Sequence, residues 1–92
     1  MTPETAEKIA IHALSWMAAD DEILGAFLNA AGAAPGDLRT RAADPAFLGF
    51  VLDFLLTRDD MISAFAGSAN ISPETPFRAR AYLPGGDLPN WT

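Results

Sequence analysis

The sequence predicts an all-α protein, a compact bundle of about six helices that forms two similar three-helix units around an apolar central helix. Alanine supplies about a fifth of the 92 residues, whereas valine occurs only at Val51 and isoleucine is sparse. Because helices favour alanine and leucine and strands favour β-branched residues, this composition favours helices. Apolar residues also recur at intervals of three and four, the spacing of one helix face.

The first two helices are predicted from the residues at their ends. Thr2 is a capping residue before a helix predicted over about Pro3–Ala19. The acids Asp20 and Asp21 are typical N-caps of a second helix, and Gly32 is a left-handed stop for it. The two apolar stripes consist of Ala6, Ile9, Ala10, Ala13, Trp16 and Met17, and of Leu24, Phe27, Leu28 and Ala31.

Prolines mark the starts of the third and fourth helices. Pro35 begins a short helix that ends near Ala43, and Asp44-Pro45 is an N-cap acid followed by a proline in the first turn. The residues that follow are apolar nearly all round, which is typical of a helix surrounded by protein or lipid. The run is only about ten residues, where a bilayer needs roughly twenty, and it contains Asp53. We therefore predict the central helix of a soluble core.

Two further helices are predicted before the C-terminus. Asp59 and Asp60 are expected to cap the fifth helix, which ends at Asn70, a residue that tolerates the left-handed conformation. Ser72-Pro73-Glu74 is a start signal for the sixth helix. The predicted inner side of the sixth helix consists of Phe77, Ala81 and Tyr82.

These elements predict one helical domain over residues 1–84, because a chain of this length forms a single hydrophobic core. Residues 85–92 are rich in Gly, Pro, Asp and Asn and have no apolar periodicity. We predict that they form a flexible C-terminal tail. Whether Leu88 and Trp91 pack back onto the body is left open at this point.

An ungapped shift of about 38 residues aligns two halves of the chain, 3–43 and 44–84. We call it the repeat shift. Identical pairs include Leu14 with Leu52, Asp21 with Asp59, Phe27 with Phe65 and Pro35 with Pro73. Neither half could bury its apolar face alone. We therefore predict two units packed about a pseudo-two-fold axis, with Trp16 and Phe54 at equivalent sites.

A family resemblance is carried by Asp44-Pro45-Ala46-Phe47-Leu48, by Val51-Leu52-Asp53-Phe54-Leu55-Leu56 and by the closing Leu83-Pro84-Gly85. The chain resembles a bacterial family, domain of unknown function 3572, from about Leu14 to Gly85. The resemblance implies a helical fold and a bacterial cytoplasmic setting, and it carries over no catalytic or ligand residue. Arg58-Asp59-Asp60 departs from the Asp-Glu expected there.

The charge and composition disfavour several functions. The net charge is −6, whereas nucleic-acid binding needs a basic face and anionic membranes attract Lys and Arg. We expect neither partner, although the tight turns would fit a helix-turn-helix. With no cysteine and with His12 as the only histidine, we expect no metal site and no cofactor. Glu4 and Glu7 stand where a secretory signal would be basic, which favours the cytoplasm.

Asp53 is the acid most relevant to function, because it interrupts the most apolar helix on a face shared with the small residues Ala46 and Gly49. It is either the solvent-facing edge of that helix or a carboxylate paired across the domain, since unpaired burial costs several kcal/mol. Its candidate partners are Arg39, Arg41 and Arg80. The arginines could also gather into an anion-binding patch.

The overall prediction is a non-enzymatic protein-interaction or regulatory domain that binds another protein or a second copy of itself. Six phenylalanines, two tryptophans and one tyrosine are many for so small a core, and an exposed apolar patch marks an interface. The alternative is a small-ligand or enzymatic site in a groove between the two halves, with Asp53 or the arginines inside. An enclosed pocket that holds charged residues would favour the alternative.

Overall fold

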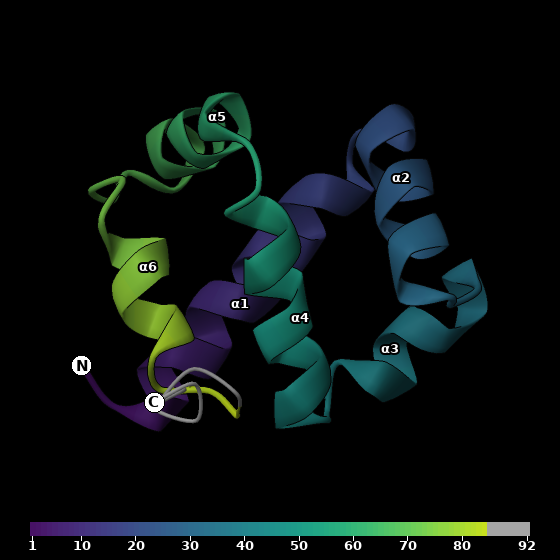
Figure 1. The fold of residues 1–92 in the computed structure, drawn as a ribbon, viewed down its shortest axis with the longest axis horizontal. Coiled ribbons are helices and arrows are strands. Elements are labelled where there is room, and N and C mark those ends of the chain that lie inside the picture. The colour runs from purple at the N-terminus through teal and green to yellow at the C-terminus, as the bar shows by residue number, and fades with distance from the viewer. Residues whose placement is uncertain (85–92) are drawn as a thin grey trace, which may run out of the picture.

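Six α-helices and one 3₁₀ turn make up residues 1–84, the part of the chain that the computed structural model describes (Figure 1). The helices are α1 (Pro3–Ala18), α2 (Asp21–Ala31), α3 (Leu38–Arg41), α4 (Pro45–Leu55), α5 (Asp59–Ala69) and α6 (Thr75–Arg80), and the 3₁₀ turn Pro35–Asp37 leads directly into α3. The predicted all-α class is confirmed. The predicted tail, with Leu88 and Trp91, lies outside the described residues.

Side-chain caps begin three of the helices at the predicted residues. Thr2 accepts a hydrogen bond from the amide of Thr5, and Asp44 accepts one from the amide of Ala46. Asp20 accepts from the amides of Glu22 and Ile23. Each bond satisfies an amide that has no partner inside the helix.

Left-handed residues end α2 and α5 as predicted. Gly32 has φ 65° and Asn70 has φ 59°. Glycine and asparagine adopt this conformation at lower cost than other residues, and the turn lets the chain leave the helix sharply.

The predicted caps of α5 are wrong. The N-cap is Arg58, whose backbone is extended, and no side chain caps this helix. Asp59 and Asp60 lie inside the first turn, where their negative charges interact favourably with the positive end of the helix dipole. The carboxylate of Asp60 accepts hydrogen bonds from the guanidinium of Arg58.

Helices α1 and α4 cross in the middle of the molecule, with α2 and α3 on one side and α5 and α6 on the other (Figure 1). The core has its centre on α4, which is buried at Phe47, Leu48, Val51, Leu52 and Leu55. Met17, Phe27 and Phe65 join it from the other helices and are fully buried. Among the described residues, no polar or charged side chain is buried.

Two aromatic contacts are related by the repeat shift. Trp16 of α1 packs against Phe65 of α5 with ring centroids 5.9 Å apart, and Phe54 of α4 packs against Phe27 of α2 at 5.4 Å. The shift converts one pair into the other with the two halves exchanged, which is the relationship that a two-fold axis produces. Helices α2 and α5 also have the same length of 11 residues. These two features agree with the predicted pseudo-two-fold arrangement. The arrangement stays a prediction for the whole domain, because the close packing of α1 on α6 has no equivalent between α4 and α3.

The predicted inner side of α6 is wrong. Phe77 and Tyr82 are 54% and 46% exposed, and Ala81 is also exposed. The buried side consists of Pro76 and Ala79, and Leu83, which follows the helix, is also buried. Helix α6 packs against α1 and α4, and the small side chain of Ala79 allows the close approach that a large aromatic residue would prevent.

No helix in residues 1–84 combines the length and the apolar character needed to cross a membrane. The longest, α1, has 16 residues and carries charged side chains, and α4, the most apolar, has 11.

Candidate functional site

Asp53 of α4 and Arg80 of α6 form a two-pronged ion pair. Arg80 Nε donates to Asp53 Oδ1 at 2.6 Å, and Arg80 Nη2 donates to Oδ2 at 3.0 Å. The Arg80 side chain is 16% exposed and the Asp53 side chain 52% exposed. Asp53 is therefore both solvent-facing and paired. Two parallel hydrogen bonds of this kind fix the orientation of both groups.

Gly49 allows α6 to approach α4 closely enough for this pair. Arg80 Nη1 donates to the carbonyl oxygens of Leu83 at 3.3 Å and Pro84 at 3.0 Å. A Cβ atom at residue 49 would lie 3.0 Å from both Arg80 Nη1 and the Pro84 oxygen. We call the contact made by Gly49, Asp53 and Arg80 the closed seam between α4 and α6.

Arg39 and Arg41, the other two predicted members of the polar cluster, lie on α3 and do not join the pair. The guanidinium carbon of Arg41 lies 5.8 Å from the centroid of the Phe47 ring, a cation–π contact. Arg39 lines the groove between α1 and α3 that is described below. Among the described residues, the ion pair of Asp53 involves Arg80 alone.

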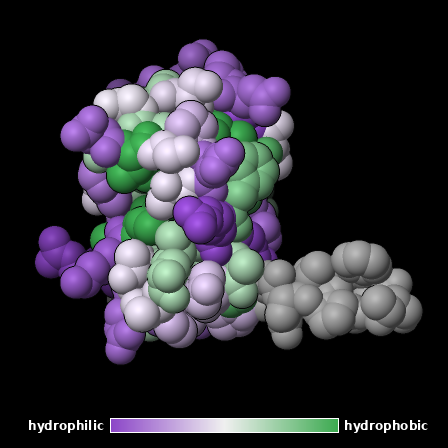
Figure 2. Space-filling view, turned by 90° about the vertical axis from the view of Figure 1, so that its left-hand side faces the viewer, coloured by the Kyte–Doolittle hydropathy of each residue, from purple (hydrophilic) through white to green (hydrophobic). Residues whose placement is uncertain are grey.

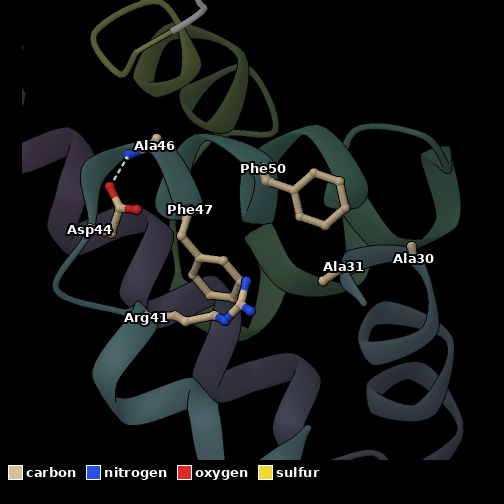
Figure 3. A pocket seen from close by; sticks show the side chains of 7 residues that line it. All are labelled: Ala30, Ala31, Arg41, Asp44, Ala46, Phe47 and Phe50. Atoms are coloured by element: carbon tan, nitrogen blue, oxygen red, sulfur yellow. Dashed lines mark hydrogen bonds between the residues drawn. The ribbon is translucent and has the colours of Figure 1, made fainter. Parts of the chain in front are cut away.

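A first open groove, the α2–α4 groove, has a volume of about 290 Å³ (Figure 3). It is lined by Ala30, Ala31, Arg41, Asp44, Ala46, Phe47 and Phe50. Figure 3 shows the Arg41 guanidinium against the Phe47 ring and the Asp44 carboxylate turned towards the Ala46 amide. Both charged side chains of this groove therefore already have an interaction within the chain.

A second open groove, the α1–α3 groove, is the most apolar of the three and has a volume of about 370 Å³. Its lining consists of Ile11, Leu14, Ser15 and Ala18 of α1 and Leu38, Arg39 and Ala42 of the α3 segment. Ile11 is 42% exposed. Arg39 is the one charged residue in the lining, and it makes no ion pair with a described residue.

A third groove, the inter-half groove, lies between the starts of α2 and α5 and has a volume of about 260 Å³. Its charged residues are Asp20, Glu22 and Arg58. Asp20 caps α2. Arg58 binds Asp60, which lowers the pKa of the Asp60 carboxyl below its ordinary value and raises the pKa of Arg58. Two of the three charged groups therefore already have partners.

The repeat shift aligns residues of the α1–α3 groove with the residues of the closed seam in the sequence. Gly49 falls on Ile11, Asp53 on Ser15 and Arg80 on Ala42. The first half therefore lacks the glycine that permits close approach and both members of the ion pair. In the predicted repeat arrangement, these three differences would leave the first half open where Gly49, Asp53 and Arg80 close the second.

The described residues offer no cluster of three or more His, Cys, Asp or Glu side chains that could hold a metal ion. His12 is exposed and lies edge-on to the Phe65 ring, with centroids 5.4 Å apart. The imidazole is thus an aromatic neighbour of the core.

The comparison with protein families gives one match. Residues 3–86 match the family described as "Protein of unknown function (DUF3572)". The chain belongs to this family. The DUF3572 match covers the closed seam and all three grooves, and it confirms the resemblance seen in the sequence. No curated protein and no solved structure matches the chain.

The sequence prediction missed the α1–α3 groove of this DUF3572 protein. One signal could have revealed it, because Ile11 is a large apolar residue that lies outside the predicted inner stripe of α1. An apolar side chain off the core stripe either stays exposed or lines a secondary contact. Leu38 and Ala42, which form the opposite wall, come from a segment too short to show a period.

Proposed function

We propose that this DUF3572 protein is a non-enzymatic protein-binding domain whose docking surface is the α1–α3 groove, occupied by one helix of a partner protein. The observation that carries the proposal is the apolar lining of this groove together with the 42% exposure of Ile11. An apolar side chain that fills such a groove gains the free energy of leaving water. A helix that lies along α1 and α3 would cover the apolar lining of this groove.

The length of the groove suits a helical occupant. Its α1 residues extend from Ile11 to Ala18, which is about two helical turns at roughly 1.5 Å per residue. Amphipathic helices dock into grooves of this kind through apolar residues spaced by three and four positions. We place the interaction in the bacterial cytoplasm, the setting that the family resemblance implies.

The face over α5 and α6 offers less support for docking. Figure 2 shows this side of the molecule, where green apolar areas are separated by purple and white ones. The exposed aromatic residues Phe77, on α6, and Tyr82, just after it, thus lie in surroundings of mixed polarity. Singly exposed apolar residues are common on protein surfaces.

A small-ligand or catalytic site in the inter-half groove is the second candidate. Its support is the meeting of charged residues from both halves, Asp20, Glu22 and Arg58. The capping bonds of Asp20 and the pairing of Arg58 with Asp60 weaken it, because a ligand that binds these groups would have to compete with their partners within the chain.

The docking proposal is tested by affinity capture from cell extract with the wild-type chain and two variants, Ile11→Asp in the groove and Phe77→Asp on α6. Both residues are exposed, so both variants are expected to fold, and circular dichroism checks this. We expect a protein captured by the wild type to be lost with Ile11→Asp and kept with Phe77→Asp. The purified protein should then bind the purified wild type directly.

Equal capture by both variants would contradict the α1–α3 groove as the docking surface. Sedimentation of the purified chain tests the other occupant. A dimer that Ile11→Asp dissociates would show that a second copy, and not a partner protein, fills the groove.

A further inference from the structure

We infer that the helix received by the α1–α3 groove is acidic, with a carboxylate that pairs with Arg39 beside its apolar anchors. This inference rests on the docking function proposed above and adds the charge of the partner to it. It starts from the different situations of the three arginines that were candidates for function.

Two of those arginines have a partner inside the chain. Arg80 binds the Asp53 carboxylate and two backbone carbonyls, and Arg41 stacks on the Phe47 ring. Arg39 is exposed, makes no ion pair with a described residue and lines the most apolar groove. A cation at the edge of an apolar surface selects a partner that offers both an apolar side chain and an acid.

The closed seam contains the same chemistry. There, the guanidinium of Arg80 and the carboxylate of Asp53 join α6 to α4, two helices that also pack against each other. In the first half the repeat shift places Ser15 at the acid and Ala42 at the arginine, and Arg39 lies three residues before Ala42. A carboxylate supplied by the partner helix would pair with Arg39 and close the groove with an ion pair of the same type.

At physiological salt, the negative net charge of the chain does not prevent the binding of an acidic helix in the groove. The net charge is −6, and the field of charges farther than about 8 Å away is screened at physiological ionic strength. On α1, Lys8 and Glu7 precede Ile11 by three and four residues and offset each other. Arg39 therefore sets the charge preference at the groove itself.

The test is a displayed library of amphipathic helices with a fixed leucine face and with Glu, Lys, Gln or Ser at the polar positions. The library is selected on the full-length chain at about 0.15 M salt, where charge pairs at contact still act and distant charges are screened. We expect Glu to be enriched over Lys by about tenfold at the position nearest Arg39, which corresponds to about 1.4 kcal/mol. The variant Arg39→Glu should reverse this preference, and the matched control Arg78→Glu on α6 should leave it unchanged.

The two proposals fail in different ways. If helices are enriched on the wild type and lost on Ile11→Asp, but without a preference for Glu or with the preference kept in Arg39→Glu, the acidic partner is wrong and the docking groove stands. If no helix is enriched on the wild type relative to Ile11→Asp, the docking function itself is wrong. Ala18→Glu, at the other end of the groove, is a second groove variant in which Ile11 is unchanged. It should lose the enriched helices as Ile11→Asp does.

Discussion

Asp53 on the central helix and Arg80 on the last helix join parts of the chain that are 27 residues apart. Every other side-chain hydrogen bond in residues 1–84 spans four positions or fewer. Within residues 1–84, this pair is therefore the one side-chain hydrogen-bonded contact between distant parts of the chain. Its removal should lower the free energy of unfolding of the domain.

Asp53→Asn is expected to lower the free energy of unfolding by about 1 kcal/mol, because it removes the charge that Arg80 faces in a mostly buried position. For a domain of this size such a loss lowers Tm by about 4–8 °C. Thermal unfolding followed by circular dichroism measures it. The matched control is Asp60→Asn, which also removes a carboxylate from an arginine but in an exposed, local pair. An unchanged Tm for Asp53→Asn would show that the pair adds nothing to stability.

Gly49→Ala is expected to destabilise the protein, although alanine is the better helix former. The new Cβ would lie 3.0 Å from Arg80 Nη1 and from the Pro84 oxygen, so the closed seam must open by a few tenths of an ångström. The control is Gly25→Ala in α2, where no atom lies within 4 Å of the new Cβ. That variant should gain about 0.5–1 kcal/mol from helix propensity. Urea denaturation compares the two, and an equal gain at both positions would contradict the tight packing of the seam.

The two aromatic contacts related by the repeat shift should show similar coupling. Double-mutant cycles with leucine at Trp16 and Phe65, and at Phe54 and Phe27, are expected to give coupling energies of about 0.5–1.5 kcal/mol each. Trp16 and Phe27 belong to different contacts, and their cycle should give a coupling near zero. Coupling in one pair only would contradict equivalent roles for the two halves.

The pKa of the Asp60 carboxyl is lowered from its ordinary value of 3.8, first through its hydrogen bond with Arg58. A lowered folded-state pKa contributes stability that is present above the unfolded-state pKa and is lost as the pH falls through the folded one. Arg58 has a raised pKa, so its contribution is complete throughout the acid range. Carboxyl NMR titration should place Asp60 below its ordinary value in the wild type and move it upwards in Arg58→Gln. The same titration midpoint in both proteins would contradict the pair.

The sequence predicted the helices and most of their ends because these depend on neighbouring residues. Asp20 and Asp44 cap their helices through amides two or three positions away, and Gly32 and Asn70 adopt the left-handed conformation within their own turns. Such local chemistry is visible in the order of residues alone.

The inner side of α6 and the α1–α3 groove were missed because both depend on packing between distant segments. A helix of six residues is too short for its period to outweigh the expectation that Phe77 and Tyr82 point inwards. Ala79 and Pro76 are buried instead because they let α6 come close to its neighbours. For the candidate site, the sequence identified Asp53 and three possible partners, and the choice of Arg80 follows from the place where α6 returns to α4.

The interior of residues 1–84 has a further consequence, since it contains no buried polar or charged side chain. In an interior of apolar side chains, no side-chain hydrogen bond fixes which helices pack together or their relative position along their axes. The specificity of the fold therefore comes from the helix N-caps, the left-handed residues at helix C-termini and the closed seam. Evolution of this chain should therefore have more freedom to exchange apolar residues at its centre than to alter the polar residues at its helix ends.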